Sequence, residues 1–254
     1  EAVLRDAHLF FNQVLEEDQP KLLTARQNSL ANKSVFNVVT RMRRADGNIR
    51  WMQLSSTPRR LPDGRFVWDG IETDVTEQKN AEERIQHLNR VYAVLSDINQ
   101  TIVREKDSQT MLKTACRIAV EKGTFRMAWI GMLDAETQCL KPVAAAGFVD
   151  GYTDLLHIDL KNPQSNGPAA SALISGERTI CNDIEHDPLY APWRDEALRR
   201  GYRASGKFPL KVEGKVVGLF NLYAGNSGFF NTEELLLLDE LAMDSVGRQK
   251  LYGA

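Results

Sequence analysis

The stretch Asp74–Val103, DVTEQKNAEERIQHLNRVYAVLSDINQTIV, determines how this chain is organised. From Glu77 onward it contains neither Gly nor Pro, and one set of side chains recurs at alternating spacings of about three and four. The pattern predicts a single helix of roughly 40 Å, at 1.5 Å per residue, with a seam that can pair with a partner helix. The seam comprises Gln78, Ala81, Ile85, Leu88, Tyr92, Leu95, Asn99 and Ile102.

A second apolar stripe runs along the later half of this helix. Val91, Val94 and Ile98 lie beside the seam, so this half should also pack on the domain that follows. One side of the helix therefore suits a second copy of the chain, and the other suits a domain. The alternative is an ordinary amphipathic helix inside a single globule.

Composition limits the classes of partner. The chain has 254 residues, enough for two domains, and a formal net charge of −2 with interspersed positive and negative residues. This offers no broad basic field for nucleic acid or for a membrane surface. No apolar run approaches the ~18 residues of a membrane span, and no signal sequence opens the chain. We therefore expect a cytoplasmic protein. A chain that starts at Glu1 without Met is either processed or cut from a longer one, and the pattern of the first 76 residues favours the cut.

The three cysteines predict no disulfide framework and no metal site. Cys116, Cys139 and Cys181 lie far apart in the sequence, without CxxC spacing or clustering with His. We expect small buried side chains with reduced thiols, and no catalytic nucleophile.

Three strands are predicted in residues 1–76. VFNVVTRMRR and IRWMQLSSTPRR are joined through Asp46-Gly47, and a Pro62-Asp63-Gly64 turn leads into FVWDGIETDV. Upstream, Asp18 and Pro20 are typical of the start of a helix. The stretch DAHLFFNQVL (6–15) also has the apolar pattern of a short amphipathic helix.

The blocks "RMRRADGNIRW" and "PRRLPDGRFVWDGIETDVTEQKNAEER" resemble the C-terminal part of a PAS sensor domain over residues 8 to 84. The resemblance implies five strands, of which only the last three are recognisable, and it pairs the last strand with the missing first one. We therefore expect an incomplete sheet whose edge at Phe66–Asp74 is open, or is covered by the N-terminal segment or a second chain.

The same resemblance implies a coupling point in the signature Asp74-Val75-Thr76, where the sheet meets the long helix. Asp74 is expected to cap the helix, and Arg50, next to Trp51, is its expected partner across neighbouring strands. The alternative is an exposed ion pair worth at most ~1 kcal/mol.

Residues 104 to 254 predict an antiparallel sheet framed by a first and a last helix. SQTMLKTACRIAVEKG is an amphipathic helix, strands and short helices follow it, and Asn231 with Glu234 forms a capping box for the last helix. Six blocks, among them "FRMAWIGMLD", "GPAASALISGERTICNDI" and "FPLKVEGKVVGLFNLYA", resemble a GAF domain spanning about residues 88 to 250. The predicted class is α+β: a partial PAS domain (1–76), a connecting helix (77–103) and a GAF domain (104–254).

The resemblance does not identify a cofactor. The lysine of the cyclic-nucleotide signature is absent, and Cys181 departs from the bilin-attachment patterns. His157 and His186 are candidate axial ligands of a haem only because they are histidines, and a solvated loop His is the expected interpretation of both. A small molecule is expected between the sheet and the cover formed by residues 183–200. The candidate ligand-binding residues are Trp129, Tyr190, Trp193, Arg194, Lys207, Asn221 and Tyr223. Asn221 is chosen because a polar side chain within VVGLFNLY is costly to bury without a partner. The alternative is that these side chains simply fill the core.

We predict a non-catalytic sensory fragment of a bacterial signalling protein. It dimerises through the long helix and the last helix (232–250), and it passes a ligand or partner state to an effector of the diguanylate cyclase, phosphodiesterase or histidine kinase type. The alternatives are a scaffold whose pocket is filled, and a free methionine sulfoxide reductase, which needs a low-pKa thiolate with a resolving thiol nearby.

Overall fold

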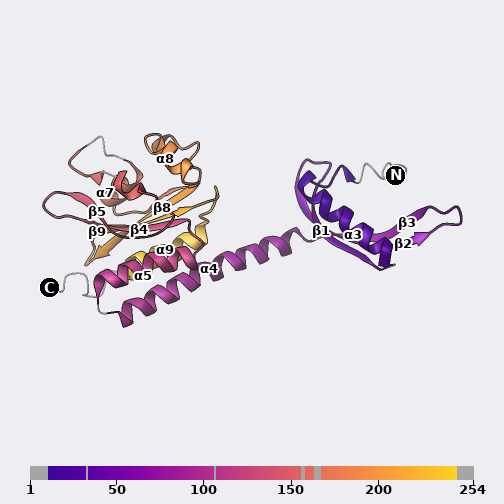
Figure 1. The fold of residues 1–254 in the computed structure, drawn as a ribbon, viewed down its shortest axis with the longest axis horizontal. Helices are drawn as coiled ribbons and strands as arrows, with labels where there is room; N and C mark the ends of the chain where they lie inside the picture. Colours follow the sequence, from indigo (N-terminus) through magenta and orange to yellow (C-terminus); the bar gives the residue numbers. More distant parts are fainter. Residues whose placement is uncertain (1–10, 33, 106, 156–157, 163–166, 245–254) are drawn as a thin grey trace. The chain divides into compact units, whose positions relative to one another are not determined.

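A computed structural model describes residues 11–32, 34–105, 107–155, 158–162 and 167–244; side chains are not described for Val103 and 240–244. The chain divides into two compact units, Glu1–Ile85 and Gln86–Ala254. Figure 1 shows the elements of each unit, and helix α4 (Thr76–Arg104) continues from the first unit into the second.

The first unit is a three-stranded antiparallel sheet with one helix. Its elements are η1 (Glu16–Asp18), α3 (Gln19–Asn32), β1 (Phe36–Arg43), β2 (Ile49–Arg60), β3 (Phe66–Asp74) and the start of α4. The order is β1-β2-β3, and Gly47 and Gly64 take positive φ angles of 84° and 87° in the connecting turns, as Asp-Gly predicted.

The expected incomplete sheet is confirmed for the residues that the structure describes. Val14 forms an isolated bridge to Met42, so the N-terminal segment covers the β1 side, and no described strand pairs with the outer side of β3. Of the predicted helix at residues 6–15, residues 6–10 lie outside the described residues, and of residues 11–15 only Phe11 is helical. The core of this unit consists of Val14, Leu22, Phe36, Val38, Met42, Met52 and Leu54.

The second unit contains a six-stranded antiparallel sheet in the order β6-β5-β4-β9-β8-β7. The strands are β4 (Met127–Leu133), β5 (Cys139–Gly147), β6 (Ile158–Asp159), β7 (Thr179–Cys181), β8 (Ala204–Val212) and β9 (Lys215–Ala224). The helical elements are α5 (Ser108–Glu121), α6 (Tyr152–Leu155), α7 (Pro168–Ser175), η3 (Pro188–Tyr190), α8 (Arg194–Arg199) and α9 (Thr232–Asp244). The α+β class is confirmed.

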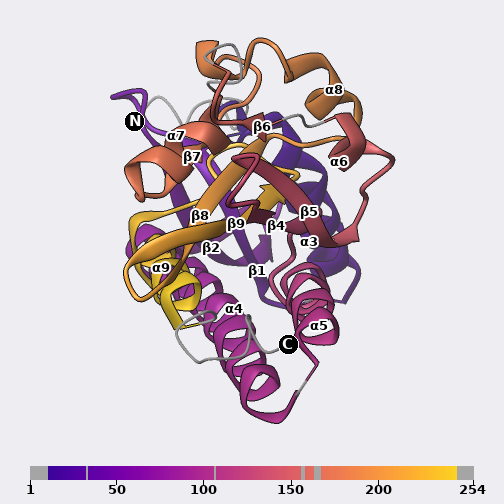
Figure 2. The same ribbon diagram turned by 90° about the vertical axis from the view of Figure 1, so that its left-hand side faces the viewer.

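The sheet of the second unit separates two cores. Helices α4, α5 and α9 lie on one face, and α7 and α8 cover the other (Figures 1 and 2). Along β9, Phe220 and Leu222 join the helix-side core, whereas Leu219 and Tyr223 join the core on the other face. Because neighbouring strand residues point to opposite faces, each face receives every second side chain.

Candidate functional site

A small cavity lies on the α7–α8 side of the sheet in the second unit. Its volume is about 30 Å³, which is room for about one water molecule. Strands β4, β8 and β9 supply its floor, while α7 and the segment from η3 to α8 supply its cover. Its lining consists of Trp129, Tyr152, Ile158, Gly167, Pro168, Ala169, Ala170, Tyr190, Trp193, Lys207 and Tyr223.

The structure brings five of the seven predicted ligand-binding residues to this cavity. These are Trp129, Tyr190, Trp193, Lys207 and Tyr223. Arg194 is not among the lining residues: its guanidinium donates to the carbonyls of Ile184 at 3.3 Å and Asp187 at 2.8 Å. Arg194 therefore holds the cover segment together.

Asn221, the seventh predicted residue, belongs to a polar row that crosses three strands beneath the cavity. On β9 it is directly opposite Trp129 of β4 on one side and Lys207 of β8 on the other. All three residues are buried, at 0%, 1% and 3% exposure for Asn221, Trp129 and Lys207. Three polar residues are thus placed side by side in an otherwise apolar layer.

Two atoms of this row are buried and have no hydrogen-bond partner of good geometry in the part of the chain that the structure describes. Nδ2 of Asn221 donates to the carbonyls of Trp129 at 3.5 Å and Leu219 at 3.4 Å, but Oδ1 has no partner among the described residues. Nε1 of Trp129 also has none of good geometry there, although it is near enough to the Tyr223 hydroxyl to oppose the rise that burial causes in the pKa of that tyrosine. An unpaired buried polar atom costs about 1–3 kcal/mol, so a group that supplied the missing bonds would be stabilised here.

Lys207 is the cationic side chain of the row. Its Nζ donates to Tyr190 Oη at 2.7 Å and lies 4.4 Å from the centre of the Tyr223 ring. Burial lowers the pKa of Lys207 to about 7, because the charged form loses its hydration, while Cys181 and Asp187 oppose this fall. The ammonium group is therefore poised between its charged and neutral forms near neutral pH.

The tyrosines around the cavity remain neutral. Burial raises the pKa of Tyr152, Tyr190 and Tyr223 well above the ordinary value. Tyr190 Oη donates to Ser205 Oγ at 2.8 Å, and the Tyr152 and Tyr223 rings meet edge to face with centres 5.6 Å apart. These contacts give the cavity rigid aromatic walls.

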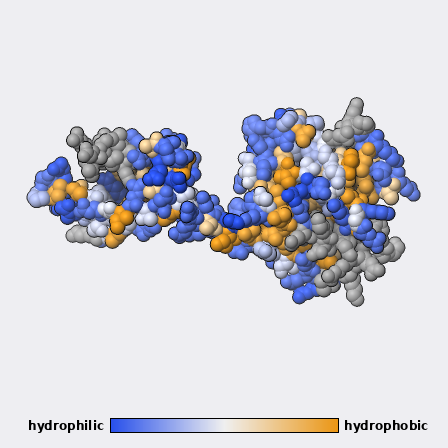
Figure 3. Space-filling model, turned by 180° about the vertical axis from the view of Figure 1, so that it is seen from behind, coloured by the Kyte–Doolittle hydropathy of each residue, from blue (hydrophilic) through white to orange (hydrophobic). Residues whose placement is uncertain are grey.

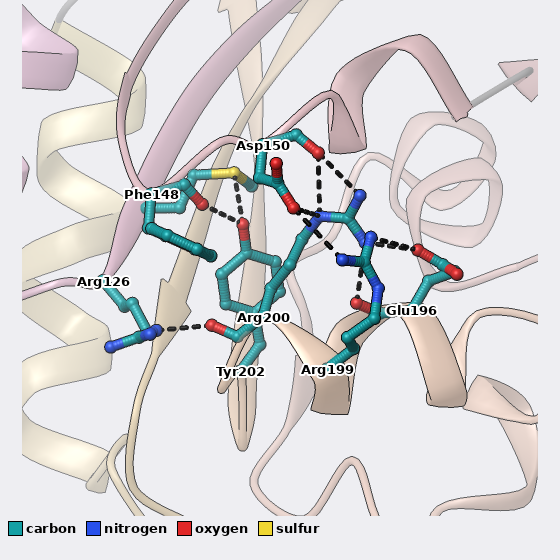
Figure 4. Close-up of polar contacts among 8 residues, drawn as sticks. Arg126, Phe148, Asp150, Glu196, Arg199, Arg200 and Tyr202 are labelled. Carbon is teal, nitrogen blue, oxygen red and sulfur yellow. Dashed lines mark hydrogen bonds and ion pairs between the residues drawn. The ribbon is translucent and has the colours of Figure 1, made fainter.

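An arginine network anchors the cover (Figure 4). Arg200 donates to the carbonyl of Asp150 at 2.6 Å and to the carboxylate of Glu196, and its guanidinium lies 5.3 Å from the centre of the Tyr152 ring. Nε of Arg126 donates to the carbonyl of Arg200 at 2.5 Å. The end of α8 is thereby bonded to the start of β4 and to the segment before α6.

Sequence reasoning missed the lining residues contributed by α6, β6 and α7. Gly167 matters because an added Cβ would lie 2.3 Å from the Trp193 ring, so the indole packs directly on the backbone. The only signal in the sequence was the pair Gly167-Pro168 before a short helix, which marks an N-terminus but not a cavity wall.

Two of the three cysteines are poorly suited to nucleophilic chemistry, whereas Cys139, predicted to be buried, is only half-buried. Cys116 and Cys181 are buried, and burial raises the pKa of each thiol to about 12. Both side chains are therefore protonated near neutral pH, and a protonated thiol is a weak nucleophile.

The predicted coupling residues come together at the junction of sheet and helix in the first unit. Trp51 N–H donates to Thr76 Oγ1, its carbonyl accepts from Val75 N–H, both at 2.9 Å, and Asp74 Oδ1 accepts from Thr76 N–H at 3.0 Å. The hydrogen bonds from Thr76 lower the pKa of Asp74. Arg50 lies 3.9 Å from Asp74, and both side chains are more than a third exposed, so water and salt screen the attraction between them.

The predicted seam of α4 is only partly exposed. Ile85 and Tyr92 are 58% and 57% exposed, and Leu88 is half-buried. Figure 3 shows apolar surface on this stretch of the helix. Leu95 and Ile102 are instead buried in the helix-side core, at 8% and 7% exposure. They must be removed from the seam, because the later half of α4 uses that side to cover the sheet.

Helix α4 is also bonded to the start of α9. Arg90 pairs with the buried carboxylate of Glu234, and its guanidinium lies 4.3 Å from the centre of the Phe229 ring. Glu234 completes the predicted capping box: its N–H donates to Asn231 Oδ1 at 2.9 Å, and its carboxylate accepts from Asn231 N–H at 3.4 Å. The capping box is confirmed.

Curated relatives of this chain include sensory and regulatory proteins. The methyl sulfide methyltransferase-associated sensor of Methanosarcina acetivorans is 25% identical over 213 residues, which cover 82% of this chain and 20% of that protein. The bacterioopsin transcriptional activator of Halobacterium salinarum is 28% identical over 123 residues, covering 45% of this chain and 18% of that protein. The matches thus span at most a fifth of these relatives.

Solved structures match the second unit in fold. The GAF domain of a phosphoenolpyruvate-protein phosphotransferase from Coxiella burnetii has a TM-score of 0.53 and 17% identity, covering 62% of this chain and 90% of that chain. The reduced form of fRMsr from Staphylococcus aureus has a TM-score of 0.50 and 11% identity, covering 61% and 92%. At such identities the likeness concerns the fold alone.

No helix within the described residues has the length and apolar character to cross a bilayer.

Two family models match successive parts of the sequence. The PAS fold matches residues 2–71, and the GAF domain matches residues 105–245, which is more than half of the chain. The observed sheet order and its two helical layers agree with the second match. The chain therefore belongs to the GAF domain family, with a PAS-fold segment preceding the GAF domain.

Proposed function

We propose that this chain is a sensory module in which a small molecule bound in the GAF cavity changes the packing of helix α4. The domain pair and the sensor-type relatives support a regulatory, sensory role. The observation that carries the ligand proposal is the polar row beneath the cavity, where Asn221 Oδ1 and Trp129 Nε1 have no hydrogen-bond partner of good geometry among the described residues. A scaffold core would gain stability from apolar side chains at these positions.

Helix α4 is the proposed carrier of the signal. Its first residues are bonded to Trp51 of the PAS-fold sheet, and its later half packs in the GAF core through Val91, Val94 and Ile98. A helix satisfies its backbone hydrogen bonds internally and can move as a rigid body. A change at either end thus has a physical path along the helix. The proposed effector of this signal is a diguanylate cyclase, a phosphodiesterase or a histidine kinase.

The ligand proposal is tested by native mass spectrometry of the purified chain. We expect the purified chain to retain a small molecule. The variants Asn221→Ala, Tyr223→Phe and Trp193→Ala should retain less of it or none. Asn99→Ala, an exposed position on α4, is the matched control and should retain it. If the purified chain carries nothing and no small molecule shifts its melting temperature, the scaffold alternative replaces the sensor.

The scaffold alternative draws support from the cavity volume of about 30 Å³, which leaves no room for a metabolite without rearrangement. The reductase alternative draws support from the fold of fRMsr alone. Turnover of free methionine sulfoxide with dithiothreitol tests it directly. We expect none, because the buried Cys181 thiol stays protonated.

A further inference from the structure

The chemical class of the ligand can be argued from the polar row and the walls around it. This step rests on the proposed function of the cavity. The row offers two donors, Lys207 Nζ and Trp129 Nε1, and one unpaired acceptor, Asn221 Oδ1. A ligand that satisfies all three must bring an acceptor to the donors and a donor to the amide oxygen.

The charge of the ligand follows from Lys207. Among the described residues that line the cavity it alone is ionisable with a cationic form, and none is a carboxylate. One cation balances one negative charge, whereas a dianion would leave an uncompensated charge in a buried site. A cationic ligand is disfavoured because the ammonium group of Lys207 already lies near the Tyr223 and Tyr190 rings, at 4.4 and 5.1 Å from their centres.

The body of the ligand follows from the walls. Apart from Lys207, the lining consists of aromatic rings, aliphatic side chains and glycine backbone. Such walls favour an apolar or aromatic group that can stack on Trp129 or Tyr223.

The route of entry is indicated by burial. Ten of the eleven described lining residues are buried, and Trp193 is the half-buried exception. Its indole packs on the backbone of Gly167, another lining residue. A ligand larger than a water molecule would displace this ring.

We propose that the cavity binds a small monocarboxylate with an apolar body, its carboxylate accepting from Lys207 Nζ and Trp129 Nε1 while a hydroxyl or water donates to Asn221 Oδ1. The indole of Trp193 moves aside on binding. A carboxylate next to Lys207 favours the ammonium form, so binding takes up a proton when the empty site is neutral.

Affinity should therefore depend on pH. The titratable and charged groups around Lys207 are Tyr190, Tyr223, Cys181 and Asp187. The pKa values of the tyrosines and of Cys181 are raised by burial, so these groups stay neutral near pH 7. Because the empty site holds Lys207 with a pKa of about 7, carboxylate affinity should fall about tenfold per pH unit above it.

The test uses the full chain and four probes that share a phenyl ring and differ in charge: phenylacetate, benzyl alcohol, benzylamine and phenyl phosphate. Binding is measured by titration calorimetry and saturation-transfer NMR between pH 6 and 9, in two buffers that differ in ionisation enthalpy. We expect phenylacetate to bind best, with proton uptake that grows between pH 7 and 8.

Variants separate the charge from the fold. Lys207→Met should weaken phenylacetate at least about tenfold and abolish the pH dependence, because the cation is lost. Trp129→Phe, which keeps an aromatic ring but removes the indole N–H, should weaken phenylacetate binding by a smaller factor. Lys211→Met, on the same strand but outside the cavity lining, is the matched control and should leave affinity unchanged.

Two failures can be told apart. If benzyl alcohol, benzylamine or phenyl phosphate binds as well as phenylacetate, or if Lys207→Met has no effect, the monocarboxylate class is wrong while a sensing cavity stands. If no probe binds at millimolar concentration, the inference is overturned. If native mass spectrometry then also finds no retained molecule, the proposed function fails with it.

Discussion

At the scale of single residues, Lys207 shows how burial decides chemistry. The same side chain on the exposed end of a strand would be an ordinary solvated cation. Here it lies between tyrosine rings, and no carboxylate among the described residues forms an ion pair with it. A charged Lys207 therefore lowers the free energy of unfolding when no ligand is bound, and this loss can be measured.

Lys207→Met should change how stability depends on pH. The pKa of Lys207 is about 7 in the folded chain and 10.5 as its ordinary value. Between these values the unfolded chain binds the proton and the folded chain does not, so the free energy of unfolding should rise with pH, by about 1.4 kcal/mol per unit. Below pH 7 the full penalty applies. Urea unfolding from pH 6 to 10 should show this slope in the native chain and lose it in Lys207→Met. Equal slopes would contradict a buried Lys207.

Gly167→Ala should destabilise the GAF domain by about 1–3 kcal/mol through overpacking. The new Cβ would lie 2.3 Å from the Trp193 ring, which must move. Thermal unfolding and tryptophan fluorescence report the two effects. Gly225→Ala is the control, because its nearest neighbour is 3.8 Å away and it has no positive φ. A silent Gly167→Ala would mean that Trp193 does not pack there.

At the scale of elements, the later half of α4 is fixed on two sides. Its apolar side chains enter the helix-side core, and Arg90 reaches the buried Glu234 at the start of α9. An ion pair of this kind is sensitive to the loss of one partner, because the other is left partly buried and unpaired. The two helices are thus coupled by charge as well as by packing.

Glu234→Gln should cost about 1–3 kcal/mol in the free energy of unfolding. Glutamine can keep the capping box with Asn231, so the variant isolates the loss of the charge facing Arg90. Denaturant unfolding measures the cost. The matched control is Glu121→Gln, whose partner Arg117 and own side chain are both more than half exposed, and which should change stability by less than about 0.5 kcal/mol. Equal effects would argue against coupling through Arg90.

At the scale of the whole molecule, α4 belongs to both units and still exposes apolar surface at Ile85 and Tyr92. These two positions lie on one side of the helix, since a spacing of seven residues is close to two turns. We expect this shortened seam to pair with a second copy. Leu95 and Ile102 take no part, because they are buried in the GAF core.

Ile85→Glu combined with Tyr92→Glu should halve the mass of the particle in light scattering, because carboxylates facing each other in a seam repel and stay hydrated. Asn80→Glu adds a charge on a different face of the helix and should leave the mass unchanged. If the native chain is already monomeric at micromolar concentration, the seam is ruled out as a dimer interface.

Much of the fold followed from the sequence, because local rules act within short stretches. The predicted strand IRWMQLSSTPRR and the predicted helix in SQTMLKTACRIAVEKG agree with the observed β2 and α5, since turn signals and helical periodicity act locally. The three recognisable PAS strands and the capping box are confirmed for the same reason. The short elements α6 and β6 escaped because four and two residues carry no periodicity.

The sequence by itself determined which side chains lie on the sheet beneath the cavity, because alternation places Asn221 and Tyr223 on one face and the hairpin sets Lys207 beside them. Only the tertiary structure decided which side of α4 is left exposed. It also decided that Arg194 donates to backbone carbonyls of its own cover segment, and that Tyr152 and Gly167 line the cavity. The reason is that these outcomes depend on contacts between segments far apart in the chain. No local pattern encodes which of several equally apolar surfaces will meet.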